Sequence, residues 1–570
     1  MKTTRVFLAI FAALSFSGCA VVDDIPESPD IPSEPVTVDL YGTLEPFTSE
    51  AVYFIVTDRF VDGDPGNNYP DQGGTELRTF DRPIRLADSP PANIGYLGGD
   101  FRGVLDNADY IADMGFTAIW LTPIVDNPDE AFTGGALPGE GGSNDRGKTG
   151  YHGYWGVNFF ELDEHLPSPG LSYADLTRGL LDGHGIKTVL DVVCNHGSPS
   201  FSMTHDQPKY GEIYDVNGVL VADHGNLYPS ELDVGNPLHA FYRRERDLAE
   251  LSDMDYDNPD VLEYFVAAHS QWIDQGAAAI RIDTIKHMPH AFWKAFADRI
   301  RETRPDFFMF AEAYSYDAPL IAEFTYPENG GISVLDFPQQ QAMSAVFGKQ
   351  DEPYATLQDY LHLDSGVYQN PYELMTFYDN HDMRRMDADA AGFIDANNWL
   401  FTSRGIPVVY YGSEVGFRAG TDQHAGNRDY FGQDNVEAAK SHPIRNALAE
   451  IAAIRKQSVA LQRGLQLNLA FTADTAAFLR VYQKDDSRES ALVLLNKGDE
   501  AAEFDVSDWL YGVEWQRTGR NSTARLPADG ASTRVSVPAH GVRVYVTNEA
   551  LTDEALLSEL KRLKSGSNRN

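Results

Sequence analysis

The sequence predicts an α/β protein whose main domain is a (β/α)8 TIM barrel, followed by an antiparallel β-sandwich domain. Short apolar runs recur along the chain, and stretches with helical periodicity separate most of them. Helices are predicted, for example, at Leu171–Leu181, Val261–Gln275 and His290–Thr303. The predicted barrel strands are Ala51–Thr57, Phe116–Pro123, Ile186–Val193, Ala277–Ile282, Phe307–Ala311, Gly331–Leu335, Glu373–Phe377 and Ile406–Tyr411.

One connection is too long to join a strand directly to a helix. About sixty residues rich in Gly, Pro and aromatic side chains follow the third predicted strand, before a helix that begins near Asn258. We interpret residues 197–252 as an inserted domain B, which divides the catalytic barrel into residues 47–196 and 253–455.

Short alternating strands after residue 456 predict the C-terminal β domain, residues 456–548. A terminal helix and tail are expected over residues 549–570, with the helix at Glu549–Lys564. The predicted strands of the β domain are Leu467–Phe471, Ala477–Gln483, Ser490–Asn496, Ala502–Val506, Thr533–Val537 and Gly541–Thr547.

The N-terminus has the features of a targeting segment. A basic start, Met1–Arg5, precedes an apolar run from Val6 to Phe16 that is too short to span a membrane, and Ser17-Gly18-Cys19 closes it. Residues 1–18 resemble a bacterial lipoprotein signal peptide, which implies that Cys19 is lipidated and tethers the protein to the membrane of the cell envelope. The alternative is an ordinary secretory signal. Residues 19–46, rich in Pro, Asp, Glu and Ser, are predicted to be a disordered tether.

Composition limits the partners. The chain of 570 residues has a formal net charge of −40, which argues against nucleic acid and fits a neutral substrate. It has only two cysteines, Cys19 and Cys194, so acylation of the first would leave no intrachain disulfide. We expect a monomer.

Three acidic residues follow buried strands: Asp283 in Gly276–Asp283, Glu312 in Phe310-Ala-Glu312, and Asp382 in Phe377–Asp382. The carboxyl ends of barrel strands meet at one pocket, so these side chains are expected to converge there. Two carboxylates of different pKa are what a retaining glycosidase needs. Arg281 should lower the pKa of Asp283, as suits a nucleophile, and apolar neighbours should raise the pKa of Glu312, as suits a proton donor. Each acid alone would more often be a salt bridge or a helix cap.

With Asp191-Val-Val-Cys-Asn195-His196, these segments resemble the signature regions of the α-amylase family, glycoside hydrolase family 13. The resemblance implies Asp283 as nucleophile, Glu312 as general acid/base and Asp382 as transition-state stabiliser. It further implies an α-glucan substrate bound by a set of histidine, aromatic and basic side chains. These are His152, Tyr154 and Trp155 in Tyr151–Trp155, together with His196, Arg281, Lys286, His287, His381 and Arg428.

The same resemblance implies calcium as cofactor. A central site would use Asn195, Asp253 and the carbonyl of His287, since calcium prefers oxygen ligands. A second, N-terminal site resembles one found in cyclodextrin glucanotransferases and related amylases. Its residues would be Asp62, Asp64, Asn67, Asn68, Gly98 and Asp100, which otherwise form a plain turn.

The nearest branch by resemblance is that of cyclodextrin glucanotransferases and calcium-dependent bacterial α-amylases. Ala249 stands where that branch has the central aromatic residue around which the glucan curls, and a single β domain follows the barrel. Both features favour water as the acceptor, hence an α-1,4-glucan hydrolase. The alternatives are a 4-α-glucanotransferase, a maltogenic amylase and, from another class, a non-catalytic glucan-binding lipoprotein.

Overall fold

The computed structural model describes residues 39–70, 72, 77–85, 92–137, 145–422, 426–519, 523–528 and 532–567. Within these residues eight parallel strands pair in the order β14-β13-β12-β7-β4-β1-β16-β15, and a parallel bridge from Leu335 to Met375 links the two ends. The TIM-barrel prediction is therefore confirmed. The strands are β1 (Val52–Ile55), β4 (Ala118–Leu121), β7 (Lys187–Val192), β12 (Ala277–Ile282), β13 (Phe308–Ala311), β14 (Ser333–Val334), β15 (Met375–Thr376) and β16 (Ile406–Tyr410).

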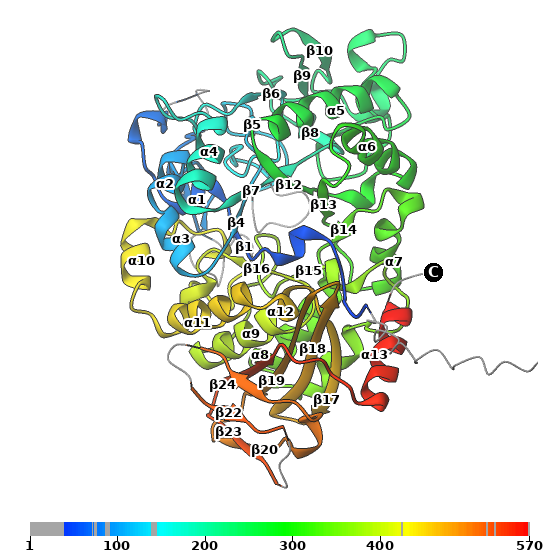
Figure 1. The fold of residues 1–570 in the computed structure, drawn as a ribbon. Helices are drawn as coiled ribbons and strands as arrows, with labels where there is room; N and C mark the ends of the chain where they lie inside the picture. The colour runs from blue at the N-terminus through cyan, green and yellow to red at the C-terminus, as the bar shows by residue number, and fades with distance from the viewer. Residues whose placement is uncertain are drawn as a thin grey trace, which may run out of the picture. The chain divides into compact units, whose positions relative to one another are not determined.

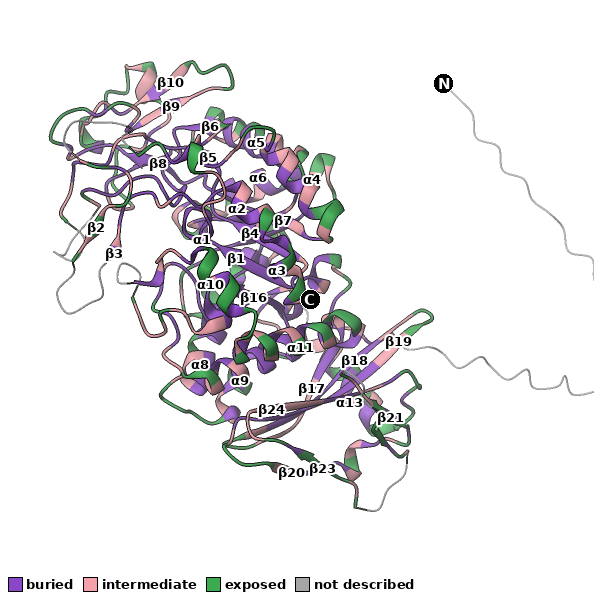
Figure 2. Ribbon diagram, turned by 90° about the vertical axis from the view of Figure 1, so that its left-hand side faces the viewer, coloured by how far each residue is buried: buried purple, intermediate pink, exposed green. Residues whose placement is uncertain are grey.

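The barrel strands are apolar because both of their faces are covered. Every residue of β1, β4, β13 and β16 is buried, and helices such as α4 and α5 pack on the outside (Figures 1 and 2). Helix α4 begins at a capping box of Ser172 and Asp175 and ends at Gly185, whose φ of 67° suits glycine. The helices around the barrel are α1 (Thr57–Phe60), α2 (Phe101–Asp106), α3 (Ala108–Asp113), α4 (Tyr173–His184), α5 (Pro259–Asp274), α6 (His290–Thr303), α7 (Ala318–Ala322), α8 (Phe337–Phe347), α9 (Ala390–Thr402), α10 (Gly432–Ala439), α11 (Pro443–Gln457) and α12 (Val459–Arg463).

The long segment after β7 forms small antiparallel pairs. Strand β8 (His196–Pro199) pairs with β11 (Leu251–Asp253), so that His196 faces Asp253 where the segment leaves and rejoins the barrel. Strands β9 (Glu212–Tyr214) and β10 (Leu220–Asp223) form a hairpin between them. A second antiparallel pair, β5 (Val125–Asp126) and β6 (Asn158–Leu162), lies in the connection after β4 and was not predicted.

The C-terminal domain is built on an antiparallel sheet of order β17-β18-β19-β24-β21-β22, accompanied by the pair β20 and β23. All six predicted strands occur, and β21 and β22 are additional. Helix α13 (Glu554–Ser567) begins five residues later than predicted, since Asp553 accepts a hydrogen bond from the Leu556 amide and caps it. The strands are β17 (Leu465–Phe471), β18 (Thr475–Lys484), β19 (Ser487–Asn496), β20 (Ala502–Asp505), β21 (Trp515–Arg517), β22 (Arg525–Leu526), β23 (Arg534–Val537) and β24 (Gly541–Thr547).

The first described residues differ from the predicted tether. Leu40 is buried and pairs with Gln483, and Asp39 forms an ion pair of 2.7 Å with Lys484, because this stretch supplies an apolar side chain to the edge of the C-terminal sheet. Residues 39–570 form one compact unit. The predicted signal peptide, Cys19 and the predicted tether up to Val38 lie outside the described residues. In the part of the chain that the structure describes, no helix has the length and apolar character of a membrane span.

Candidate active site

The three acidic residues line one cavity of about 580 Å³ at the carboxyl ends of the barrel strands. Asp283 follows β12, Glu312 follows β13, and Asp382 lies in the loop after β15. The side chains of Asp283 and Glu312 are 7% and 8% exposed, and that of Asp382 is 24% exposed. The structure therefore brings together the residues that the sequence predicts to share a pocket, at the end of the barrel where TIM-barrel active sites lie.

Arg281 is the centre of the carboxylate cluster. Its Nη1 lies 2.7 Å from Asp283 Oδ1 and 2.8 Å from Asp191 Oδ1, and its Nη2 lies 2.7 Å from Glu312 Oε2. Residues two apart on a strand face the same side, which is why Arg281 reaches Asp283. Asp191 had no predicted role. Its other oxygen accepts hydrogen bonds from Trp120 Nε1 and the Tyr154 hydroxyl at 3.0 and 2.8 Å.

Two of the three carboxyl groups on Arg281, those of Glu312 and Asp283, have different pKa values. Burial raises the pKa of Glu312 to about 8, although Arg281 opposes this, and burial raises the pKa of Asp283 to about 6 against the same guanidinium. Near pH 7 Glu312 is thus mainly protonated and Asp283 mainly ionised. Arg281 does lower the pKa of Asp283, as expected, but burial raises it by more, so the net pKa lies above rather than below the usual range.

Asp382 has the opposite electrostatic setting. Burial alone would raise its pKa, but His381, Arg428 and Arg281 lower it to about 2. Burial lowers the pKa of His381 itself to about 3, so the two guanidinium groups act on Asp382 at neutral pH. Arg428 Nη2 lies 2.5 Å from Asp382 Oδ1, and Arg428 Nε donates to the His381 carbonyl at 2.9 Å.

The predicted sugar-binding residues line the same cavity, with one exception. Arg281 is 1% exposed and lies behind the carboxylates, so it contacts them rather than the open space. The rings of Tyr154 and His381 stack with centroids 5.4 Å apart. Burial keeps His152 and His196 neutral by lowering both pKa values, that of His196 to about 3. The residues that line the cavity as predicted are His152, Tyr154, Trp155, His196, Lys286, His287, His381 and Arg428.

Sequence reasoning missed other residues of the cavity wall. Tyr314, 38% exposed, presents an aromatic ring two residues after Glu312, and its carbonyl accepts a hydrogen bond from the Lys286 ammonium group. Lys148 and Leu248 also line the cavity. Ala249, which the sequence had already singled out, also lines it, with a φ of 50°, a left-handed conformation uncommon for alanine. The Tyr314 position could have been found, because an aromatic residue near a catalytic acid suits a sugar face.

The proposed central calcium residues lie where β8 and β11 pair. Asp253 Oδ1 is buried without a hydrogen-bond partner, and Asp253 Oδ2 accepts from the Asp247 amide at 2.7 Å. Burial raises the pKa of Asp253 to about 7. His287 Nδ1 lies 3.1 Å from Asp247 Oδ2, next to this group. The Met254 amide, next to Asp253, donates to the Asn195 carbonyl at 2.8 Å, and an orphaned carboxylate oxygen in this segment fits a hard cation.

The N-terminal cluster has the same feature, a buried oxygen without a hydrogen-bond partner, at three side chains. Asp62 Oδ1, Asn67 Oδ1 and Asn68 Oδ1 are buried and have no hydrogen-bond partner. A Cβ at Gly98 would meet Asn68 Oδ1 at 2.5 Å, so glycine leaves room for a ligand atom there. Asp64 and Asp100 instead accept backbone amides, and Asp100 caps α2. The residue set fits a cation, with Asp62, Asn67 and Asn68 as the available oxygens.

Two further acidic groups that sequence reasoning missed have the spacing of metal ligands. They are Asp163, Glu164 and His165, and Asp126, Asp129 and Glu164. Lys209 Nζ already lies 3.2 Å from both Asp126 and Asp129. This ammonium group occupies part of the second set and offsets part of its negative charge.

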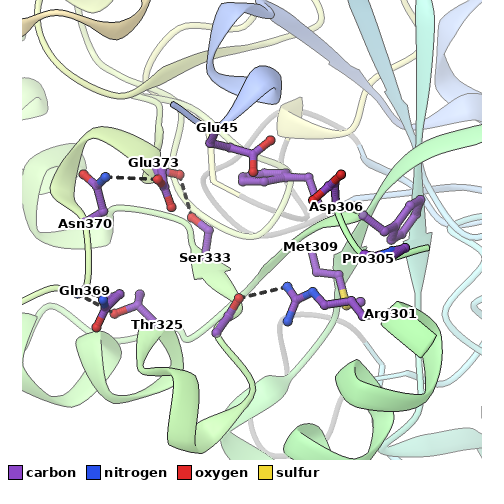
Figure 3. A pocket seen from close by; sticks show the side chains of 13 residues that line it. Glu45, Arg301, Pro305, Asp306, Met309, Thr325, Ser333, Gln369, Asn370 and Glu373 are labelled. Carbon is purple, nitrogen blue, oxygen red and sulfur yellow. Dashed lines mark hydrogen bonds between the residues drawn. The ribbon is translucent and has the colours of Figure 1, made fainter. Parts of the chain in front are cut away.

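A smaller cavity of about 170 Å³ lies at the amino ends of β13, β14 and β15, away from the catalytic acids. Figure 3 shows Glu373 held there by Asn370 Nδ2, which lies 3.0 Å from Glu373 Oε1, with Ser333 bonded to the Glu373 carbonyl. The Thr43 hydroxyl donates to the same carboxylate oxygen at 2.6 Å. The amino end of a TIM barrel contributes stability rather than catalysis.

A TIM barrel with a close pair of carboxyl groups at its carboxyl end has the arrangement that a retaining glycosidase needs. Residues 54–449 match the family described as "Alpha amylase, catalytic domain". The chain belongs to the α-amylase family and is a glycoside hydrolase of that family.

Relatives in this family have two different names. The "Cyclomaltodextrin glucanotransferase" of Klebsiella oxytoca is 28% identical and aligns with 88% of this chain and 77% of its own. The "Alpha-amylase" of Niallia circulans is 28% identical and aligns with 86% of both chains. This chain spans 65% of the length of the cyclomaltodextrin glucanotransferase of Geobacillus stearothermophilus.

Solved structures give the same pair of names. An Anoxybacillus α-amylase has a TM-score of 0.67 at 24% identity, over 89% of this chain and 99% of that chain. CldA, described as the first cyclomaltodextrin glucanotransferase with a three-domain ABC distribution, has a TM-score of 0.67 at 27% identity, over 88% of this chain and 99% of that chain. The number of domains therefore does not separate hydrolase from transferase, contrary to our expectation from the sequence.

Proposed function

We propose that this protein is a retaining glycoside hydrolase that cleaves α-1,4-glucosidic bonds in starch, glycogen or maltooligosaccharides. The observation that carries the proposal is the contact of one guanidinium, Arg281, with both Asp283 and Glu312. The two carboxyl groups lie on neighbouring nitrogens of this guanidinium, each 2.7 Å from its own. In inverting enzymes the carboxyl groups are about 6.5–9.5 Å apart, which leaves room for a water, so this close pair supports retention.

In the first step, an Asp283 oxygen attacks the anomeric carbon while Glu312 gives its proton to the glycosidic oxygen. The bond to the leaving sugar breaks, and its electron pair stays on the oxygen that Glu312 protonates. In the second step, the Glu312 carboxylate takes a proton from water, whose oxygen attacks the anomeric carbon and releases Asp283. The pKa values of about 8 and 6 leave the proton and the charge where the first step requires them.

Asp382 stabilises the positive charge that develops on the reacting sugar. Its pKa of about 2 keeps it ionised at any pH where the other two acids work. The ring of Tyr154 offers a flat apolar surface to the sugar, beside the His381 ring on which it stacks. Because Asp283, Glu312 and Asp382 are all present, a non-catalytic glucan-binding lipoprotein is disfavoured.

Ala249 supports water rather than a sugar as the acceptor. Its methyl group lines the cavity next to Leu248, and both pack against Phe132, Trp155, Met203, Tyr210 and Leu251, so no aromatic ring projects from position 249. A glucanotransferase, including the cyclodextrin-forming and maltogenic types, is the second candidate. The exposed ring of Tyr314 favours it, because an acceptor sugar can stack there.

We propose calcium as the cofactor, with one central and one N-terminal site. Asp253, Asn195 and the His287 carbonyl would hold the first ion, and Asp62, Asn67 and Asn68 with the Gly98 backbone would hold the second. Bound calcium would neutralise these carboxylates and fasten the segment between β8 and β11 to the barrel.

The place of action stays a prediction from the first nineteen residues. We propose a monomer attached to the cell envelope by lipidated Cys19 and acting on α-glucans there. Metabolic labelling with a radioactive fatty acid tests the anchor: wild type should be labelled, and a Cys19→Ala variant should not.

Product analysis on amylose, pullulan and maltoheptaose tests the activity. A hydrolase gives linear maltooligosaccharides from amylose, with one new reducing end for each bond broken. Cyclic products, or longer oligosaccharides made from maltoheptaose, would show the transferase instead. No product from any of the three glucans would refute both candidates.

A further inference from the structure

Asp382 lies farther from its barrel strand than the other two catalytic acids. Asp283 and Glu312 each follow the last residue of a strand, and the backbone amide of each donates to a carbonyl of the neighbouring strand at 2.9 Å. The strand before Asp382, β15, ends six residues earlier at Thr376, and the Asp382 amide donates to a nearby side chain, Asn380 Oδ1, at 2.9 Å. The position of Asp382 therefore depends on contacts with other segments of the chain.

Asn427, in the connection between β16 and α10, supplies such a contact. Its side chain is fully buried and does not line the catalytic cavity, whereas the next residue, Arg428, does. Asn427 Nδ2 donates to the Asn380 carbonyl at 2.8 Å and also to the Met383 carbonyl. We propose that Asn427 is a positioning residue, which bridges the chain on either side of the turn that carries Asp382 and so aims this carboxylate at the reacting sugar. The inference rests on the proposed function and deepens it.

The bridge needs an amide group at position 427. Only a hydrogen-bond donor can stand between two carbonyl oxygens, because a carbonyl oxygen accepts and cannot donate, and the Asn427 amide nitrogen has one N–H for each of them. Among the residues that the structure describes, Asn427 Oδ1 has no hydrogen-bond partner. The side-chain hydrogen bonds of Asn427 thus go to the Asp382 turn. An aspartate of the same shape would place a carboxyl oxygen against the two carbonyls and lose the bridge.

Asn427 is itself anchored to a barrel strand. Its backbone carbonyl accepts hydrogen bonds from Arg385 Nη2 at 3.1 Å, from Arg385 Nε at 3.3 Å and from the Tyr410 hydroxyl at 3.4 Å. Arg385 is buried, donates to the Tyr411 carbonyl at 2.9 Å, and has its guanidinium carbon 4.4 Å from the centre of the Tyr410 ring. Because Tyr410 is the last residue of β16, whose residues are all buried, the bridge is fixed to the barrel rather than to a second loop.

Arg428 extends the contact from the backbone of the turn to the carboxylate. Its Nη2 lies 2.5 Å from Asp382 Oδ1, and its Nε donates to the His381 carbonyl at 2.9 Å. Two consecutive residues, Asn427 and Arg428, therefore contact four consecutive residues, 380–383. Loss of the bridge would let the turn and this ion pair shift together, and a displacement of about 1 Å at a catalytic group can lower the rate by about 100-fold.

Asn427→Asp tests the bridge, because the side chain keeps its shape and loses the donor. We expect kcat on maltoheptaose to fall by about 10–100-fold while KM changes by less than about 3-fold, since the side chains that line the cavity stay in place. Asn427→Ala, which removes the bridge without burying a charge, should show the same division between kcat and KM. Activities are compared per folded molecule, measured by circular dichroism.

Asn496→Asp is the matched control. Asn496 is as deeply buried in the C-terminal sheet, and its Nδ2 likewise donates to backbone carbonyls, those of Glu500 at 2.8 Å and Pro538 at 3.0 Å. This variant loses a similar pair of hydrogen bonds at a place with no contact to the catalytic cavity. It should keep wild-type kcat per folded molecule.

A second readout needs no substrate. Amide hydrogen exchange of residues 380–386 should become about 10-fold faster in both Asn427 variants and stay at the wild-type rate in Asn496→Asp. Wild-type kcat in the Asn427 variants, an equal loss of kcat in Asn496→Asp, or unchanged exchange of this segment would each overturn the inference. If wild type cleaves no α-glucan, the proposed function fails, and the exchange measurement still decides whether Asn427 holds the Asp382 turn.

Discussion

At the scale of single residues, Asp283 and Glu312 have different pKa values although their surroundings are nearly the same. Both are buried and both contact Arg281, yet the pKa values are about 6 and about 8. The charge of Asp283 raises the pKa of Glu312 further. Both groups share one cation, and the pKa difference, which leaves Asp283 ionised and Glu312 protonated near pH 7, assigns the nucleophile and the proton donor.

Asp283→Asn should lower kcat by about 1,000-fold or more, since the amide cannot form the covalent bond to the anomeric carbon. The assay is reducing-sugar release from soluble starch. Asp109→Asn, on the exposed surface of α3, is the control and should keep full activity. Full activity in Asp283→Asn would refute the assigned nucleophile.

The pH dependence of kcat/KM should be bell-shaped. Asp283 must be ionised, so activity rises with pH through about 6, and Glu312 must be protonated, so activity falls above about 8. The two values belong to the coupled pair. On a substrate whose leaving group needs no proton, Glu312→Gln should regain much of its activity. Its pH profile on that substrate should have no basic limb. A profile without a basic limb for wild type on starch would contradict this assignment.

Sequence reasoning located the three acids because each ends an apolar strand, and the ends of barrel strands meet. It did not find Asp191 as a partner of Arg281, nor the stacking of Arg59 under Tyr151, since these contacts join residues far apart in the chain. It also misjudged the net pKa of Asp283, because the depth at which a carboxyl group is buried depends on three-dimensional packing.

At the scale of elements, the predicted strands differ from the observed ones mainly at their ends. Strand β12 and helix α6 occur as predicted, because a buried run and a strong helical period have clear limits. Strands β21 and β22 have three and two residues, too few for an alternating pattern to show. The pairing of β8 with β11 connects residues 196 and 253, and no local pattern reveals that register.

Calcium should stabilise the connection between these elements. Chelation should lower Tm by about 5 °C and reduce activity, and calcium should restore both, because an ion bound only to the folded state stabilises it. Differential scanning calorimetry gives the shift. Asp253→Asn should retain part of the calcium response through the N-terminal site, and a double variant with Asp62→Asn should lose it. If chelator changed neither the Tm nor the activity of the wild type, the proposal of both calcium sites would be contradicted.

At the scale of the whole molecule, residues 39–48 connect parts that are distant in sequence. Leu40 pairs with Gln483 of β18, Thr43 bonds to Glu373 before β15, and the Arg455 guanidinium of α11 donates to the Thr48 carbonyl at 3.1 Å. The barrel and the C-terminal sheet thus share one short segment. The composition of residues 39–48 is typical of a linker, so the sequence does not reveal that they connect the barrel with the C-terminal sheet.

Glu373 makes this connection sensitive to pH. Burial raises its pKa to about 7 from 4.5, so the folded state holds a proton that the unfolded state releases, and this contribution to stability is lost as pH rises through 7. Glu373→Gln keeps an oxygen for Thr43 without the charge. It should raise Tm at pH 8 by about 2–4 °C and leave Tm at pH 5 nearly unchanged. A lower Tm at pH 8 would contradict the raised pKa.

The configuration of the first product tests the central claim, that Asp283 and Glu312 act as a close pair on an α-glucosidic bond. Proton NMR of wild type acting on maltoheptaose, recorded before mutarotation, reports the new anomeric centre directly. Two displacements at one carbon predict the α-anomer, released as a linear oligosaccharide. Initial appearance of the β-anomer would mean a single displacement by water and would contradict the account.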